Sequence, residues 1–113
     1  MTNKNESEFS PEFTPQVSTI LDNYSVENME QFEILSDSIR CQIIGMLIEK
    51  PMTGAQIARK LQIDRHRIYY HLNLLEEHGL IKFQGERRVK GVIEKYYRAV
   101  ARHYLTDQPK KKT

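Results

Sequence analysis

A run of aromatic and basic residues between Asp64 and Gly79 holds the side chains best suited to chemistry in this sequence. At about 100° per helical residue, with Ile68 facing inward, Leu72 and Leu75 fall on the same inner side. The side chains that point the other way are His66, Tyr69, Tyr70, Asn73 and Glu77. An exposed face of this kind adds little to solubility, but it can donate to phosphates, read base edges and contact thymine methyl groups. The face therefore predicts a ligand, and double-stranded DNA fits it.

Two arginines flank this face in the first turn of the predicted helix, at Arg65 and Arg67. A helix N-terminus carries partial positive charge, so the same turn combines side-chain and backbone attraction for a phosphate. The alternative is that the arginines pair with surface acids such as Glu76 or Glu77. We expect contact with DNA.

A short helix precedes this segment and completes a helix pair. Thr53 and Gln56 have the spacing of a capping box, and Ile57 and Leu61 share one face of the helix that follows. Residues 62–64 then form a turn in which Asp64 caps the next helix. The pair has the spacing of a helix-turn-helix, with a recognition helix over about 65–77, and we expect Thr53, Gln56 and Asn73 to join the DNA contacts.

Two further helices are predicted before this pair. Ser25 is expected to cap a short amphipathic helix, and Ser36 or Asp37 a core helix that Pro51 stops. The apolar positions expected on these helices are Val26, Met29, Phe32 and Leu35 on the first, and Ile39, Ile43, Ile44, Leu47 and Ile48 on the second.

A β-hairpin is predicted after Gly79, where the apolar pattern changes from helical to extended. Its strands are expected at 80–83 and 92–100, joined by a polar stretch whose basic residues are Arg87, Arg88 and Lys90. Such a tip can reach a minor groove or flanking phosphates, although charges also protect exposed sheet edges. Either Gly85 or Gly91 can form the apex of the turn. A last short helix is expected from Ala101 to Leu105.

Several runs of the sequence resemble ArsR-type winged helix regulators of prokaryotes. These runs are Leu35 to Arg40, Ile63 to Leu72 and Leu75 to Ile81, and the match covers about residues 25–105. The resemblance implies a helical core with a two-stranded wing, homodimerisation through terminal helices, and operator binding by the fourth helix.

The resemblance also implies roles for single residues. The recognition positions fall on Arg65, His66, Tyr69 and Tyr70, a third-helix backbone contact falls on Gln56, and the wing bases are Arg87, Arg88 and Lys90. Many relatives carry a Cys-x-Cys metal motif in the third helix, but 53–61 has no Cys, His, Asp or Glu. We therefore predict no metal site and no cofactor, while a site shared between subunits at His103 is a weak alternative.

Catalytic motifs are missing from the sequence. It has no glycine-rich phosphate loop after a strand, no serine elbow and no helical His-Glu-x-x-His pair. Cys41 could act as a redox switch beside Arg40, but a lone helical cysteine is more often a small packing residue. The chain is predicted not to be an enzyme.

Composition and charge limit the remaining possibilities. With 113 residues the chain suits one domain, which we place at 17–106 between a disordered arm at 1–16 and a basic tail at 107–113. Net charge is −6 over 1–36 and +8 over 37–113, so the body is basic, as binding to phosphates requires. Apolar runs are too short to cross a bilayer, and one cysteine forms no internal disulfide. We expect a cytoplasmic, nucleoid-associated protein.

The prediction as a whole is a mainly α protein with a small β-hairpin (α+β), a winged helix-turn-helix. It would bind double-stranded DNA sequence-specifically as a homodimer and regulate transcription, most simply by repression, with no identifiable small-molecule effector. Leftover apolar residues of the terminal segments would form the dimer contact: Val26, Met29, Phe32, Tyr104 and Leu105. The alternative is a protein-interaction module anchored by Tyr69 and Tyr70.

Overall fold

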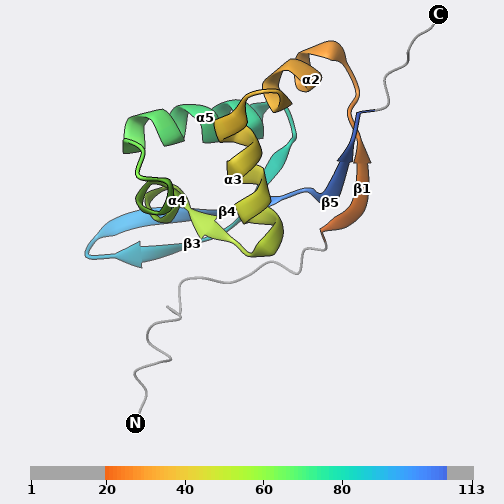
Figure 1. The fold of residues 1–113 in the computed structure, drawn as a ribbon. Coiled ribbons are helices and arrows are strands. Elements are labelled where there is room, and N and C mark those ends of the chain that lie inside the picture. The colour runs from red at the N-terminus through yellow and green to blue at the C-terminus, as the bar shows by residue number, and fades with distance from the viewer. Residues whose placement is uncertain (1–19, 107–113) are drawn as a thin grey trace, which may run out of the picture.

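The computed structural model describes residues 20–106, which form four helices and five strands (Figure 1). In chain order these are β1 (Leu21–Ser25), α2 (Met29–Leu35), α3 (Ser38–Glu49), β2 (Met52–Thr53), α4 (Gly54–Leu61), α5 (Arg65–Glu77), β3 (Ile81–Val89), β4 (Val92–Ala99) and β5 (Ala101–Leu105). The predicted arm at 1–16 and tail at 107–113 lie outside the described residues.

Local capping sets the ends of the three long helices, close to where the sequence predicts them. The Asp37 carboxylate accepts from the backbone N–H of Ile39 at 2.8 Å and caps α3. Thr53 caps α4 through a complete capping box, and Asp64 caps α5. Gly79, with φ of +73°, follows α5 in the left-handed conformation that glycine adopts easily.

The core lies where α3, α4 and α5 meet the sheet. Its largest fully buried apolar side chains are Ile43, Leu47, Ile57, Ile68, Leu72, Leu75, Leu80 and Ile81. On α3, α4 and α5 these buried residues fall at positions that the apolar spacing predicts. The spacing was wrong for α2, which buries Gln31 and Ile34 and leaves Met29 and Phe32 exposed. The packed core holds α5 with one face inward and leaves its other face in solvent.

The predicted hairpin is present, but its strands are longer than expected. β3 and β4 pair antiparallel from Ile81↔Ala99 to Val89↔Val92, and β2 pairs with β4 on its other side. The prediction of a polar tip over 84–91 was therefore wrong, because most of this stretch is paired strand. The turn is only Lys90 and Gly91, both with positive φ, a geometry that matches the twist of a two-residue hairpin. Gly91, not Gly85, forms the apex.

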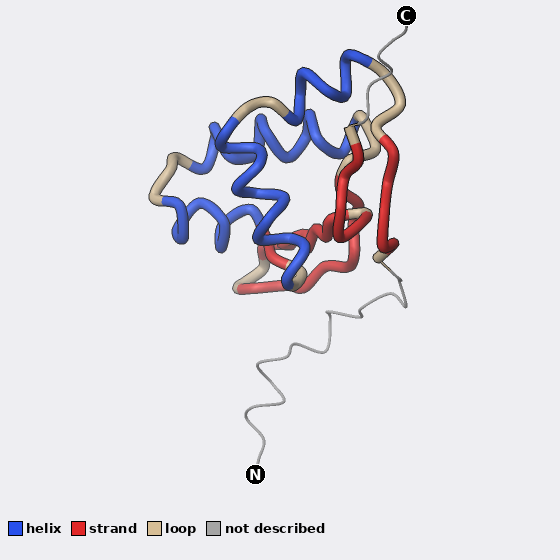
Figure 2. The backbone as a smooth tube through the Cα atoms, turned by 45° about the vertical axis from the view of Figure 1, so that its right-hand side comes forward, coloured by secondary structure: helices blue, strands red, loops and turns tan. Residues whose placement is uncertain are grey.

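The terminal segments differ most from the prediction. Leu21–Ser25 is a strand, so α2 begins after Asn28, whose side chain accepts from the Gln31 N–H, and the predicted cap at Ser25 was wrong. The predicted helix at Ala101–Leu105 was also wrong, because this segment is β5 and runs parallel to β1. Figure 2 shows the two strands side by side at one end of the molecule.

The tyrosines of these strands explain why the pair is stable. The Tyr24 and Tyr104 rings meet edge to face at 6.0 Å, and both pack on the core. The Tyr104 hydroxyl donates to the Leu80 carbonyl and accepts from the Val100 N–H. Tyr104 therefore packs inside the fold through its ring and hydroxyl, and its place in a dimer contact stays a prediction.

Candidate nucleic-acid interface

A tight turn joins α4 to α5 and sets the angle between them. Gln62 has φ of +58°, and the Ile63 N–H donates back to the Ala58 carbonyl at 3.1 Å. In Figure 1, α4, the start of α5 and the tip of the β3–β4 hairpin all lie on the left, and β1 and β5 lie on the right. One end of the molecule therefore presents the helix pair and the hairpin together.

The outward face of α5 contains the residues that the helical spacing predicts. Ile68, His71, Leu72 and Leu75 are buried. The exposed positions are Arg65, His66, Arg67, Tyr69, Tyr70, Asn73, Glu76 and Glu77. The two tyrosines differ, because Tyr70 is 61% exposed and Tyr69 only 37%.

Tyr69 owes its lower exposure to close packing on α4. A Cβ built on Gly54, the first residue of α4, would lie 2.7 Å from Cζ of the Tyr69 ring. The absence of a side chain at Gly54 thus creates the space for the ring. Tyr69 couples the two helices. Tyr70 is the more exposed aromatic residue, although its ring meets the His71 ring edge to face at 5.3 Å.

The two arginines at the start of α5 are available for an external ligand. Within residues 20–106, no ion pair involves Arg65 or Arg67, so the alternative pairing with Glu76 or Glu77 is not found. Beside them, His66 Nδ1 lies 3.4 Å from the Asp64 carboxylate. This turn presents two free guanidinium groups at the positive end of a helix.

The buried side of α5 is fastened to α3 by a polar contact. His71 Nδ1 lies 3.0 Å from Nη1 of Arg40, whose Nε donates to the Ile34 carbonyl at 2.7 Å. Burial, together with the positive charges of Arg40 and Arg67, lowers the pKa of His71. A neutral imidazole can accept from Arg40, so His71 has a structural role in joining α5 to α3.

The C-terminal end of α5 is held by α2. Gln31 is buried, and its amide donates to the His78 carbonyl at 2.7 Å and to the Tyr24 hydroxyl at 2.9 Å. A hydrogen bond with the Leu74 carbonyl and the nearby Glu30 carboxylate raise the pKa of the half-buried His78 side chain. Both ends of the helix are therefore fixed relative to the core.

The two predicted contacts from the third helix have internal roles. Thr53 is 1% exposed, and its hydroxyl accepts from the Gln56 N–H at 3.1 Å. Oε1 of Gln56 accepts from the Thr53 N–H at 3.0 Å. The capping box therefore uses the Thr53 hydroxyl fully and leaves only the half-buried Gln56 amide nitrogen for a ligand.

The three wing bases do not share one face. Arg87 pairs across the hairpin with Glu94, 3.7 Å from its carboxylate, and its guanidinium lies 5.8 Å from the Tyr96 ring centre. Arg88 points to the opposite face because successive strand residues alternate. Arg88 and Lys90 are exposed, so they are the wing bases that remain free to meet a phosphate.

Sequence analysis missed two apolar residues at the tip of the wing. Val92 is 60% exposed and Ile93 is 47% exposed. Ile93 lies directly across from Arg88, so the two side chains share a face. The sequence did contain a signal for this exposure. Two adjacent apolar residues in a strand point to opposite faces, so they cannot both enter the core.

Residues 20–106 contain neither a group of metal ligands nor a membrane-spanning helix. Among residues 20–106, no three His, Cys, Asp or Glu side chains group as metal ligands, and His103 lies instead beside the Asp22 carbonyl at 3.2 Å. The Cys41 thiol donates to the Leu35 carbonyl at 3.0 Å. No helix in this part of the chain has the length and apolar character needed to cross a bilayer.

Comparison with known proteins finds one family model and several solved structures that resemble part of this chain. A family model described as a helix-turn-helix domain matches residues 35–82. Reduced HlyU from Vibrio cholerae superposes with a TM-score of 0.52 at 18% identity, covering 60% of this chain and 66% of that one. The repressor BigR from Xylella fastidiosa gives a TM-score of 0.50 at 20% identity, covering 60% and 62%. No curated protein sequence matches the chain.

A third structure carries the most informative description. It is a homodimeric winged helix-turn-helix DNA-binding domain from Mycobacterium bovis, described as a possible ArsR-family regulator. Its TM-score is 0.51 at 23% identity, with 62% of this chain and 60% of that one covered. This chain spans slightly less than two thirds of these relatives. The predicted winged helix-turn-helix fold is confirmed, and the structure described as a possible ArsR-family regulator shares it.

Proposed function

From the premise that this chain has the winged helix-turn-helix fold of ArsR-type proteins, we propose that it binds double-stranded DNA and regulates transcription. The observation that carries the proposal is the free basic and aromatic surface at one end of the molecule. Arg65 and Arg67 begin α5 without an ion pair within the described residues, and the hairpin extends from the same end.

In this proposal α5 enters the major groove with its first turns. Arg65 and Arg67 neutralise phosphates, and His66, Tyr70 and Asn73 meet base edges and thymine methyl groups. Tyr69 contributes mainly by holding the angle between α4 and α5. Of the candidates at the start of α4, Gln56 contributes through its amide nitrogen, and Thr53 contributes only as the helix cap.

The wing would contact DNA beside the major-groove site. Arg88 and Lys90 are exposed near the turn and suit flanking phosphates. Ile93, on the face of Arg88, adds an apolar contact to a sugar or base edge. Arg87 supports the wing from its other face through Glu94.

A second copy of the chain completes the proposed assembly, as in the homodimeric relative from Mycobacterium bovis. Two recognition helices would enter successive major grooves about 34 Å apart on a two-fold symmetric operator. Occupying the operator excludes other proteins from it, so repression is the simplest outcome. The mechanism is steric, involves no catalysis, and places the protein with the nucleoid in the cytoplasm.

Selection from a random pool of DNA duplexes tests this function. We expect enrichment of a palindromic motif, with binding that weakens steeply as salt rises because phosphate neutralisation releases counterions. Recovery of no motif, together with association that salt does not affect, would contradict the proposal. It would favour the alternative of a protein-interaction module at Tyr70, the more exposed tyrosine.

A further inference from the structure

The contact between His71 and Arg40 can exist in only one protonation state of the histidine. Nδ1 of His71 lies 3.0 Å from Nη1 of Arg40. An arginine side chain keeps its proton in proteins and has no acceptor atom, so Nδ1 must accept and cannot carry a proton. A protonated imidazole would bring two donors and two positive charges together at this distance. The contact therefore breaks when His71 gains a proton.

The charged groups around His71 keep its imidazole neutral. Within residues 20–106 they are Arg40 and Asp37 from the start of α3 and Arg67 from α5 itself, and none comes from α4 or β3. The two arginines oppose protonation, and burial opposes it more strongly. Asp37 favours the proton, but its carboxylate already accepts from the backbone N–H groups of Ile39 and Arg40. His71 is therefore neutral at ordinary pH.

His71 lies directly beneath the surface proposed for DNA. It follows Tyr70 in α5, and the two rings meet edge to face at 5.3 Å. The C-terminal end of α5 is held separately, through the hydrogen bond between the Gln31 amide and the His78 carbonyl. The contact with α3 therefore holds the middle of α5, and with it the first turns of the helix.

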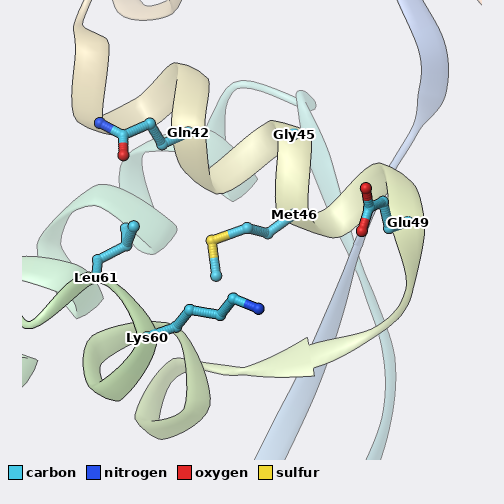
Figure 3. A pocket seen from close by; sticks show the side chains of 6 residues that line it. All are labelled: Gln42, Gly45, Met46, Glu49, Lys60 and Leu61. Carbon is cyan, nitrogen blue, oxygen red and sulfur yellow. The ribbon is translucent and has the colours of Figure 1, made fainter.

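The helix pair has room to move relative to α3. Tyr69 packs against Gly54 and couples α4 to α5. The backbones of these two helices run close together, and neither approaches α3 as closely. A hollow of about 560 Å³ lies between α3 and α4, and Figure 3 shows Met46 of α3 reaching across it toward Leu61 of α4. Without the polar contact to α3, α4 and α5 can therefore shift together.

We propose that His71 is an acid-sensitive switch for the DNA-binding surface. When the imidazole gains a proton, the contact with Arg40 is lost, α5 leaves its docked position on α3, and binding to DNA weakens. The proposal rests on the proposed function, because it names a condition that controls the same surface. The apolar core does not titrate, so the fold persists while the position of the helix pair changes.

The sign of the pH dependence separates this switch from ordinary electrostatics. In a basic DNA-binding protein, an exposed histidine near a phosphate strengthens binding when it gains a proton, and His66 should act in this way. His71 acts in the opposite direction. Burial lowers its pKa below the ordinary value of about 6.5, so docking is complete above that pH and is lost as the pH falls toward the folded pKa. The affinity for DNA should therefore fall on acidification.

Fluorescence anisotropy at constant salt, with a duplex selected from a random pool, tests the proposal between about pH 8 and about pH 5. Circular dichroism at each pH restricts the comparison to the range in which the protein stays folded. The affinity of the wild type should fall by up to about tenfold per pH unit below the folded pKa of His71, the limit for exclusion of one proton.

Two histidine variants provide the comparison. His71→Gln keeps an acceptor for Arg40 that does not titrate, so its affinity should not fall at acid pH. His103→Gln is the matched control, because His103 is exposed on β5 at the opposite end of the molecule, and it should keep the wild-type profile. A wild-type affinity that rises on acidification, or an equal fall in the wild type and His71→Gln, would overturn the proposal.

Linkage between proton and DNA supplies a second measurement. If DNA binds the neutral form of His71 more tightly, DNA must in turn make His71 harder to protonate. The pKa of His71 followed by NMR should therefore fall when the duplex is added. A histidine that simply sits near phosphates would show the opposite change. A higher pKa of His71 in the presence of the duplex would contradict the switch.

These measurements separate failure of the switch from failure of the proposed function. If only the switch is wrong, the duplex binds, but the wild type and His71→Gln share one pH profile. If only DNA binding is wrong, no duplex binds at any pH, while NMR of the free protein still shows the Tyr70 ring responding to the titration of His71. If both are wrong, no duplex binds and the Tyr70 ring gives the same response in His71→Gln as in the wild type.

Discussion

The contact between Gly54 and Tyr69 shows how one missing side chain sets the position of an aromatic ring on the outward face of α5. Gly54→Ala would place a methyl group 2.7 Å from Cζ of the ring, so the ring or α4 must move. We expect a loss of stability of about 1–3 kcal/mol, the usual cost of overpacking, measured by urea unfolding.

A double variant checks the cause. In G54A/Y69A the ring is gone, so the alanine at 54 should cost little beyond the effect of Tyr69→Ala alone. If Gly54→Ala were as destabilising without the ring as with it, the packing explanation would be wrong.

His71 makes the stability of α5 depend on pH. Its pKa in the folded protein is lowered mainly by burial, so the unfolded chain binds the proton more tightly. The contribution of His71 is therefore complete above its unfolded pKa of about 6.5 and is lost as the pH falls toward the folded pKa. When the free energy of unfolding is measured across this pH range, His71→Gln should lose less stability at acid pH than the wild type does. The reason is that glutamine can accept from Arg40 without titrating.

His78 acts in the opposite direction and serves as the control. Its pKa is raised, so its contribution is present below about 6.5 and is lost as the pH rises through the folded value. In His78→Gln, the stability that His71 loses as the pH falls is no longer offset by His78. This variant should therefore lose stability more steeply at acid pH than the wild type. Identical pH profiles for His71→Gln and the wild type would contradict the role assigned to the buried imidazole.

At the scale of elements, Tyr104 joins β5 to the rest of the fold. Burial raises the pKa of Tyr104 to about 12, so its hydroxyl keeps its proton and donates to the Leu80 carbonyl at ordinary pH. Tyr104→Phe leaves that carbonyl and the Val100 N–H without this partner. We expect a loss of about 1–3 kcal/mol in chemical unfolding.

Tyr70→Phe is the matched control, because the Tyr70 ring is 61% exposed. It removes the same hydroxyl at a surface position and should change stability by less than about 0.5 kcal/mol. Equal effects of the two substitutions would mean that β5 is not held through the Tyr104 hydroxyl.

Helices α3, α4 and α5 could be predicted from the sequence because their signals are local. Asp37, Thr53 and Asp64 cap helices that begin within one residue, and the apolar spacing identifies the buried faces. The outward face of α5 followed directly from this spacing. Tyr69 was harder to interpret, because its neighbour Gly54 lies on a different helix.

The terminal strands could not be predicted in the same way. Leu21 pairs with Ala101 at the other end of the described chain. Taken alone, neither segment has a local sequence pattern that specifies a strand. Only the partner strand selects the extended form. The wing was underestimated for a related reason: Glu86 to Val89 look like a polar loop until their pairing with β4 is known.

For the whole molecule, the surface proposed for DNA lies apart from the contacts that hold the far end of α5. The proposed DNA contacts lie on α5 and the hairpin, whereas Gln31 of α2 joins β1 to the His78 carbonyl and Tyr104 of β5 donates to the Leu80 carbonyl. Substitutions at one of these places should leave the other intact, so the two can be tested independently.

The salt dependence of DNA binding shows whether α5 and the wing neutralise phosphates. Fluorescence anisotropy with a selected duplex gives the slope of log affinity against log salt concentration for the wild type, Arg65→Ala, Arg88→Ala and the control Arg102→Ala. Arg102 carries the same charge on β5, at the opposite end of the molecule, and is 53% exposed. We predict weaker binding and a slope smaller by about 1 for each of the first two variants, and wild-type values for Arg102→Ala. Equal slopes in all four proteins would contradict the claim that α5 and the wing hold DNA.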